Sequence, residues 1–260
     1  MSPEQWKIFV GQDRNQEPQF DEEIYRRVLR CDLLQVFETH RNPGINPRYI
    51  DRPDRNRFAA GQLQCTQARR ILNLGGGGAR HLQASLANNE TEVYEVDLQG
   101  DCDLKVNLDT LPALPFDDSS FDAVCAFDVL EHLESFHLLN EEMFRVAKQY
   151  VLISLPNSAA EIFYDLFWNR PQKQPDLDRG TYSQFYGLPL RPPTDRHRWW
   201  IYFHDIVRFY FYFSLKHDAS LEFWSPSLSI RKRLFKSVFG SHIYYSFFCP
   251  FVWIKLSKRG

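Results

Sequence analysis

Ile71-Leu72-Asn73-Leu74-Gly75-Gly76-Gly77-Gly78-Ala79-Arg80-His81-Leu82 is the stretch that decides the fold of this 260-residue chain. Its first four residues form a short, mainly apolar run, which predicts a strand that is buried on both faces. The four glycines allow positive φ and let a ligand approach the main chain closely. A helix that begins just after them would direct free N–H groups toward that ligand. The stretch therefore predicts a ligand site at the carboxyl edge of an open α/β sheet.

The spacing of the small residues narrows the choice of ligand. A dinucleotide fingerprint requires a small residue five positions after its first glycine. Counted from Gly75 that position is Arg80, and counted from Gly76 it is His81. A P-loop requires Gly-Lys-Ser/Thr, which does not follow here. What remains is a G-x-G-x-A turn from Gly75 to Ala79, which suits a ligand without a pyrophosphate.

Composition excludes several classes of protein. The formal net charge of −2 does not favour a nucleic-acid binder. The five cysteines are scattered and lack C-x-x-C spacing, which argues for reduced thiols and against a zinc site or a disulfide framework. Residues 1–19 lack the charge and apolar pattern of a signal peptide, and the apolar run 244–256 is too interrupted to span a bilayer. We expect a cytoplasmic protein with no nucleic-acid partner.

Residues 1–69 are predicted to form a helical leader, and residues 70–260 to form the main domain. Asp21 could cap a helix that runs to about His40. Residues 41–56 are expected to be a loop, because Pro47 and Pro53 argue against a helix there. The leader could cover the ligand or pack on the sheet, and we favour packing.

A second strand is predicted at residues 92–96 and ends at Asp97. This acid lies roughly 20 residues beyond the glycines, where a carboxylate accepts hydrogen bonds from ribose hydroxyls. Glu95 is a weaker candidate for the same role. Further strands are expected at residues 123–127, 150–155, 221–224 and 251–256.

Several motifs follow the glycine turn in one order at workable spacings. They are Asp97, Leu114-Pro115-Phe116 with Phe121-Asp122, and Asp128-Val129-Leu130-Glu131-His132-Leu133. Together they resemble the class I S-adenosylmethionine-dependent methyltransferases, and in particular uncharacterised bacterial members. The resemblance covers about residues 70–157. It implies a Rossmann-like, doubly wound, seven-stranded α/β sheet and S-adenosylmethionine as the cofactor.

The resemblance also implies roles for individual residues. The backbone of Gly75 and Gly77 would border the methionine moiety, and Asp97 would bind the ribose. The family usually has an acid where Asn73 stands, and this acid helps to hold the methionine amino group; Asn73 can accept a hydrogen bond but carries no charge. The adenine-reading turn would be Asn107-Leu108-Asp109, in which either polar residue could contact the base, and Asp128 would lie beside the methyl group.

Residues 169–200 form a long insertion after the fifth strand, rich in Pro, Arg and Gly at its start. A loop of this length inside a compact domain is usually functional. In a methyltransferase it would lie over the acceptor pocket. We interpret it as a substrate lid, with a packed structural insert as the alternative.

Transfer to an alcohol or phenol requires removal of a proton, so a base is expected. His197 is the first candidate, followed by Asp195 and His132. A surface histidine beside Asp195 explains His197 equally well, and His132 would more often be a packing or capping residue. Asp128, Glu131 and His132 also resemble the metal-binding pattern of some small-molecule O-methyltransferases, such as those of ubiquinone synthesis. Because no fourth ligand is evident in the sequence, we expect no metal.

Residues 229–239 alternate basic and apolar side chains and end before Gly240. This pattern is typical of a helix that covers a sheet with its basic face in water. It also fits peripheral attachment to an anionic membrane, such as the inner face of the cell membrane.

The sequence therefore predicts S-adenosylmethionine-dependent methyl transfer to a small-molecule, saccharide or lipid-linked glycan acceptor, with oxygen as the expected acceptor atom. Two alternatives remain open. One is a catalytically idle methyltransferase-like scaffold or membrane-docking protein, and the other is a nicotinamide-dependent oxidoreductase. The sequence does not predict an oligomeric state.

Overall fold

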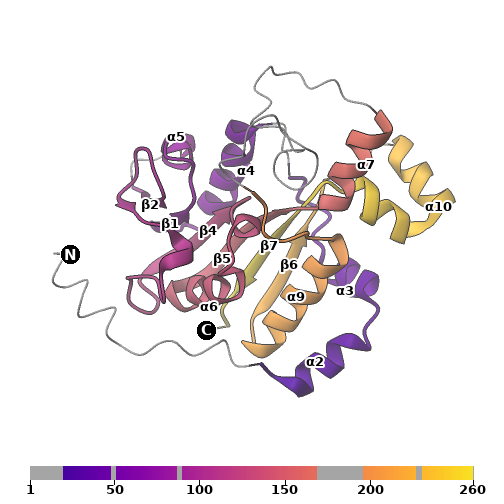
Figure 1. The fold of residues 1–260 in the computed structure, drawn as a ribbon, viewed down its shortest axis with the longest axis horizontal. Coiled ribbons are helices and arrows are strands. Elements are labelled where there is room, and N and C mark those ends of the chain that lie inside the picture. Colours follow the sequence, from indigo (N-terminus) through magenta and orange to yellow (C-terminus); the bar gives the residue numbers. More distant parts are fainter. Residues whose placement is uncertain (1–19, 48–50, 87–89, 169–195, 227–229, 260) are drawn as a thin grey trace.

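The computed structural model of the chain describes residues 20–47, 51–86, 90–168, 196–226 and 230–259. It contains a central sheet with helices on both faces (Figure 1). The seven strands are β1 (Arg70–Leu74), β2 (Glu92–Asp97), β3 (Leu104–Lys105), β4 (Phe121–Phe127), β5 (Ala147–Pro156), β6 (Ser220–Trp224) and β7 (Phe251–Ser257). Their order in the sheet is β3-β2-β1-β4-β5-β7-β6. Only β7 runs antiparallel to its neighbours β5 and β6. The predicted seven-stranded Rossmann-like sheet is confirmed.

The strand order reverses at β1, because β2 and β4 lie on its two sides. Such a reversal opens a crevice at the carboxyl ends of the strands, where open α/β sheets bind their ligands. Ile71, Leu72 and Leu74 are completely buried, as expected for a central strand. The glycine turn that follows them therefore lies at the reversal point.

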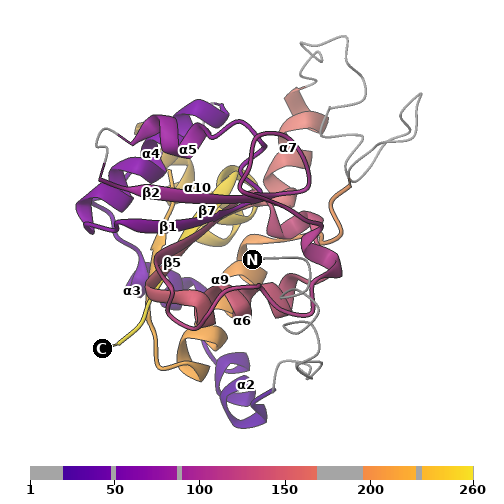
Figure 2. The same cartoon turned by 90° about the vertical axis from the view of Figure 1, so that its left-hand side faces the viewer.

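The helices form a layer on each face of the sheet (Figure 2). On one face lie α4 (Arg52–Cys65) and α5 (His81–Ser85), which enclose the smaller of two hydrophobic cores. On the other face lie α3 (Leu33–His40), α6 (Phe136–Val146) and α9 (Phe203–Lys216), which enclose the larger core. The helix α2 (Glu22–Leu29) contacts α9. The leader thus contributes to both cores, as the packing interpretation requires.

Two predictions for the leader are wrong. The helix expected from Asp21 to His40 is broken into α2 and α3, because the Asp32 carboxylate accepts from the backbone N–H groups of Leu34 and Gln35 and starts a new helix. The loop expected up to residue 56 ends earlier, since α4 begins at Arg52 after an Asp51 cap. Proline is tolerated in the first turn of a helix, where its missing N–H is not needed.

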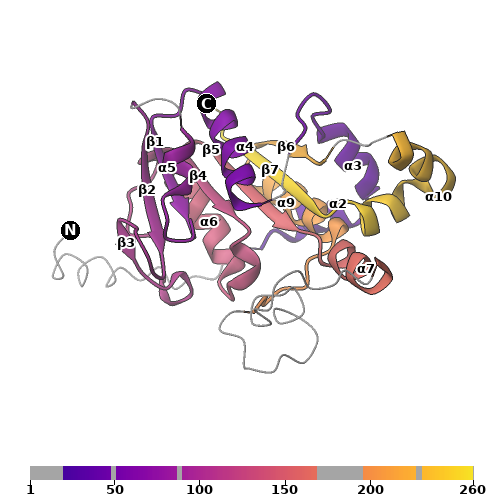
Figure 3. The ribbon, with the colours of Figure 1, turned by 90° about the horizontal axis from the view of Figure 1, so that it is seen from above.

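Two further helices, α7 (Ser158–Trp168) and α10 (Ile230–Phe248), lie side by side beyond the central sheet (Figure 3). The helix expected to end at Gly240 is interrupted there, with φ of 85°, but α10 resumes and continues to Phe248. None of the helices in the described ranges is long and apolar enough to cross a membrane.

The side chain of Asn157 links the end of β5 to α10. Its buried Nδ2 donates to the backbone carbonyls of Tyr245, Ser246 and Cys249, at 3.0, 3.0 and 2.8 Å. These carbonyls lie at the end of a helix, where intrahelical donors run out.

We expect Asn157→Ala to lower the free energy of unfolding by about 2–3 kcal/mol, because buried acceptors would lose their donor. Chemical denaturation followed by circular dichroism measures this change. Ser158→Ala is the matched control, since the Ser158 hydroxyl is buried but has no hydrogen-bond partner among the described residues. Equal losses in the two variants would contradict the capping role of Asn157.

Candidate active site

The glycine turn is fastened to β2 by backbone and side-chain hydrogen bonds. Gly75 N–H donates to the Val96 carbonyl at 2.8 Å, and Gly77 N–H donates to Asp97 Oδ2 at 2.8 Å. A Cβ on Gly75 would lie 2.4 Å from the Val129 side chain, which follows β4. The turn is therefore held between the ends of β2 and β4. The close contact with Val129 alone requires glycine at position 75, whether or not a ligand also approaches the main chain there.

Asp97 lies at the carboxyl end of β2 and is partly exposed at this edge. Besides Gly77, it accepts through Oδ1 from the N–H groups of Leu98 and Gln99, at 2.7 and 3.3 Å. An ionised carboxylate has about four acceptor sites, so these bonds leave capacity for a further donor. The ribose contact stays a prediction, whereas the hydrogen bonds show that Asp97 shapes the turn.

Asn73 contacts a carboxylate from the neighbouring strand. Its Nδ2 donates to Glu95 Oε1 at 3.2 Å, and both side chains are buried beneath the turn. Burial raises the pKa of Glu95, and the hydrogen bond from Asn73 opposes this effect. A Cβ on Gly76 would lie 1.8 Å from Glu95 Oε2, which has no hydrogen-bond partner among the described residues. A carboxylate from β2 thus lies beside Asn73, at the position where the resemblance implies an acid.

The predicted adenine turn is a short 3₁₀ helix, η1 (Leu108–Thr110). Asn107 caps it by accepting from the Asp109 N–H at 3.0 Å, and Leu108 is buried. The Asp109 carboxylate accepts from both the N–H and the hydroxyl of Ser135, at 3.1 and 3.0 Å. Both polar residues thus stabilise the turn itself, and the backbone that they shape stands at the carboxyl edge beyond β3.

Asp128 directly follows β4 and has a positive φ of 52°. Its Oδ1 accepts from the Ser154 hydroxyl at 2.7 Å, and its Oδ2 accepts from Arg55 of α4 at 3.0 Å. The same Arg55 nitrogen also donates to the Phe127 carbonyl at 2.7 Å. A non-glycine residue in this strained conformation persists only when its surroundings fix it, and such residues cluster at functional sites. Arg55 is a site residue that the sequence did not indicate.

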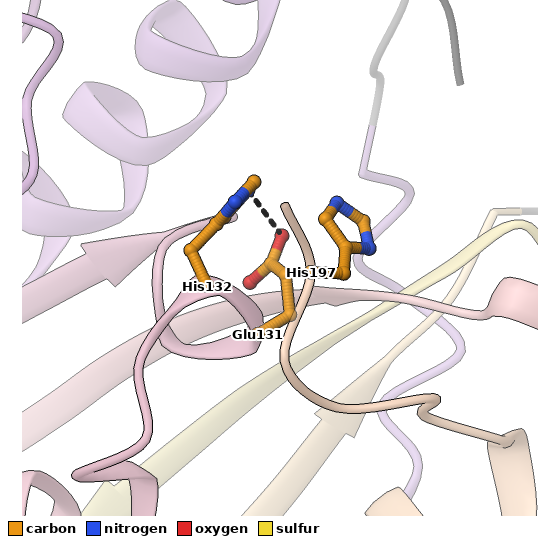
Figure 4. A group of neighbouring side chains, drawn as sticks. All are labelled: Glu131, His132 and His197. Atoms are coloured by element: carbon orange, nitrogen blue, oxygen red, sulfur yellow. Dashed lines mark ion pairs between the residues drawn. The ribbon is translucent and has the colours of Figure 1, made fainter. Parts of the chain in front are cut away.

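Three side chains converge just beyond Asp128 (Figure 4). Glu131 and His132 belong to the 3₁₀ helix η2 (Leu130–His132). His197 comes from the segment before α9, and its ring lies 4.5 Å from that of His132, edge to face. Asp195 lies outside the described residues. Two of the three candidate catalytic residues are therefore brought together.

The backbone fixes this arrangement. The Glu131 carbonyl accepts from the N–H groups of Arg198 and Trp199, at 2.7 and 3.3 Å. The indole of Trp199 donates to the Leu133 carbonyl at 2.7 Å. Residues 198 and 199 are thus attached to η2 by three hydrogen bonds, which hold His197 beside His132.

Glu131 is 1% exposed. Burial, followed by the negative charge of Asp128, raises its pKa well above the usual range. Its Oε1 lies 3.8 Å from His132 Nε2, and its Oε2 has no hydrogen-bond partner within the described part of the chain. A buried carboxylate oxygen without a donor is costly, and a strongly raised pKa in such a group makes Glu131 a candidate for a functional role.

The sheet order, the residues gathered at its carboxyl edge and a matching family model support S-adenosylmethionine-dependent methyltransferase activity. Residues 72–153 match the family model described as a methyltransferase domain. A search of curated proteins finds no match.

Solved structures of methyltransferases have a similar chain path. The methyltransferase domain of bacterial CtHen1 is 13% identical, with a TM-score of 0.49 over 78% of this chain and 97% of that one. A SAM-dependent methyltransferase from Archaeoglobus fulgidus is 16% identical, with a TM-score of 0.42 over 78% and 94%. The small RNA methyltransferase HEN1 is 15% identical, with a TM-score of 0.47 over 79% of this chain and 25% of that one.

Proposed function

We propose that the enzyme transfers the methyl group to a hydroxyl oxygen of a small-molecule, saccharide or lipid-linked glycan acceptor. The observation that supports oxygen as the acceptor atom is the cluster of Glu131, His132 and His197. It begins three residues after Asp128, the position expected beside the methyl group. A hydroxyl is a weak nucleophile at neutral pH, and groups that help to remove its proton contribute to its reactivity.

S-adenosylmethionine supplies a methyl carbon activated by its positively charged sulfur. The acceptor oxygen forms a bond to this carbon while the carbon–sulfur bond breaks and its electron pair stays on sulfur. The hydroxyl proton passes to solvent water in the same event, and the other products are S-adenosylhomocysteine and a methyl ether. Because this is an in-line displacement, alignment of oxygen, carbon and sulfur supplies most of the acceleration.

In this proposal the residues of the chain position the cofactor. Asp97 accepts from the ribose hydroxyls, and the turn around Leu108 borders the adenine. Glu95, assisted by Asn73, supplies the negative charge for the methionine amino group. Arg55 holds Asp128 in its strained conformation, so that the end of β4 faces the reacting groups.

A nucleic-acid acceptor is less well supported, because the net charge of −2 provides little attraction for a polyanion. The test is incubation with methyl-labelled S-adenosylmethionine and matched acceptors, namely hydroxylated glycans, phenols, amines and short RNAs, followed by mass spectrometry. We expect label only in base-stable methyl ethers of the non-nucleic acceptors. Label in an amine or in RNA would contradict the proposed acceptor class.

A second proposal concerns peripheral attachment to an anionic membrane through α10. Leu234, Val238 and Phe239 are 67%, 66% and 53% exposed, and they follow the basic sequence Arg231-Lys232-Arg233. Exposed apolar side chains next to basic residues favour the surface of an anionic bilayer.

We expect the protein to co-sediment with vesicles that contain phosphatidylglycerol at low salt and to dissociate at high salt, because electrostatic attachment is screened. Leu234→Ser combined with Val238→Ser should weaken this binding. Leu29→Ser on α2 is the control, since Leu29 is 53% exposed on another helix. Sedimentation that does not depend on α10 or on salt would refute the attachment.

A further inference from the structure

We propose that Glu131, His132 and His197 bind one divalent transition-metal ion, to which the acceptor hydroxyl then coordinates. The inference deepens and rests on the proposed O-methylation. It differs from the expectation of no metal. The sequence could not show that His197, which lies 65 positions after His132, reaches the same point. Figure 4 shows the three side chains converging.

The geometry of the donor atoms supports a metal. One ligand atom from each residue lies within 4.8 Å of the other two, and the Glu131–His132 distance is 3.8 Å. An ion with bonds of about 2.1 Å brings its ligand atoms to roughly 3–3.5 Å from one another. Small side-chain rotations therefore suffice to close the site, while the backbone stays attached through Arg198 and Trp199.

The burial of Glu131 points to a missing cation. This carboxylate is 1% exposed, and within the described residues no lysine or arginine forms an ion pair with it. Its Oε2 accepts no hydrogen bond there. A buried carboxyl group without a hydrogen-bond partner on one oxygen is stabilised by a cation beside it, and a coordinated metal ion is such a cation.

Asp128 is not part of the ligand set, although it belongs to the acid-x-x-Glu-His sequence pattern, because the ligand atoms that lie within 4.8 Å of one another come from Glu131, His132 and His197. The Asp128 carboxylate accepts instead from Ser154 and Arg55. The structure thus replaces the first acid of the pattern with His197. The resulting set has two imidazoles and one carboxylate.

This donor set indicates the class of ion and of acceptor. Imidazole nitrogens suit first-row transition metals such as iron, nickel and zinc better than magnesium or calcium, which prefer oxygen ligands. Three protein ligands leave open positions for exogenous oxygen atoms. An acceptor hydroxyl, or two neighbouring hydroxyls, would occupy them. Coordination lowers the pKa of a bound hydroxyl, whose proton would pass to solvent water as the carbon–oxygen bond forms. His132 and His197 would then be ligands, in place of the general bases expected from the sequence.

Cobalt(II) is the probe for the test, because its visible absorption reports the ligand set without any catalytic turnover. Dialysed, metal-free protein is titrated with Co²⁺, and the bound ion is also counted by elemental analysis. His242→Gln serves as the common background, since His204 and His242 lie 3.2 Å apart on the surface and could bind the ion themselves. We expect one Co²⁺ per chain.

Loss of a residue that only supports a metal ligand weakens metal affinity by about 10–100-fold. Because Glu131 and His197 are proposed as ligands, Glu131→Gln and His197→Ala should each weaken Co²⁺ binding by more than this. Glu134→Gln is the matched control, because it removes the same charge from a side chain that is 70% exposed three residues further on. It should leave the affinity and the spectrum unchanged. Thermal unfolding of the metal-free variants shows whether each one is folded.

Three outcomes separate the metal site from the enzyme assignment. Absence of Co²⁺ binding by the background protein, or equal binding by Glu131→Gln and Glu134→Gln, would overturn the metal site. Binding of S-adenosylhomocysteine by the metal-free protein should persist, because the cofactor contacts do not involve the ion. A protein that binds Co²⁺ in this manner but methylates no hydroxyl would keep the metal site and refute the proposed acceptor.

Discussion

Asp97→Ala is expected to weaken S-adenosylhomocysteine binding by about 10–100-fold, which corresponds to ~1.5–3 kcal/mol. The proposed contact is a charge-assisted hydrogen bond from a ribose hydroxyl to the acceptor site that the backbone leaves free, and such a bond contributes about 1.5–3 kcal/mol. Isothermal titration calorimetry with the wild type and the variant measures the loss.

The hydrogen bonds of Asp97 within the protein require a control. Its carboxylate also accepts from three backbone N–H groups at the turn, so alanine would loosen the turn as well as remove the ribose contact. Thermal unfolding of the variant therefore accompanies the calorimetry. Asp101→Asn removes a charge nearby, from a side chain that is 70% exposed and pairs with Arg80. It should change the affinity less than about 3-fold, as expected for a screened surface charge. Wild-type affinity in Asp97→Ala would refute the assigned ribose contact.

Gly78→Ala is expected to lower the free energy of unfolding by about 2–4 kcal/mol. Gly78 has φ of +63°, where an L side chain costs roughly 1–2 kcal/mol. A Cβ there would lie 2.5 Å from the Gln99 carbonyl oxygen and 2.8 Å from Gly100 Cα. These atoms belong to the backbone and cannot rotate away, so overpacking adds about 1–3 kcal/mol. The Gly78 carbonyl also accepts from the Asp101 N–H at 2.8 Å, and displacement of the loop would lengthen this bond.

Gly61→Ala provides a control of opposite sign. Gly61 lies inside α4, and a Cβ there would meet no atom within 4 Å. Alanine in a helix is about 0.5–1 kcal/mol more favourable than glycine, so this variant should be more stable than the wild type. Denaturation curves of the two variants give the comparison. Similar stabilities for Gly78→Ala and Gly61→Ala would mean that the contact between the glycine turn and the Gln99–Gly100 loop contributes little.

The sequence by itself determined the parts of the fold that local physical chemistry encodes. The apolar run before Gly75 predicted β1, because a strand buried on both faces must be apolar along its length. The residues before Asp97 predicted β2. The glycines fixed the position of the turn, since only they adopt positive φ without strain. The ligand edge of the sheet followed from these short-range signals, and the class of enzyme was predicted from the resemblance of the ordered motifs to a known family.

The tertiary structure decided the contacts between residues that are distant in sequence. Arg55 reaches Asp128 across 73 positions, Glu95 meets Asn73 only because β1 and β2 pair in one register, and His197 joins His132 only because residues 198 and 199 bond to η2. No local pattern encodes such encounters, because they depend on how the strands are ordered and where the chain returns. The two wrong predictions for the leader concern helix starts. Asp32 and Asp51 each cap a new helix, at positions where the sequence predicted a continuous helix and a loop. The turn proposed to border the cofactor was thus visible in the sequence, whereas the cluster proposed to act on the acceptor is a product of the fold.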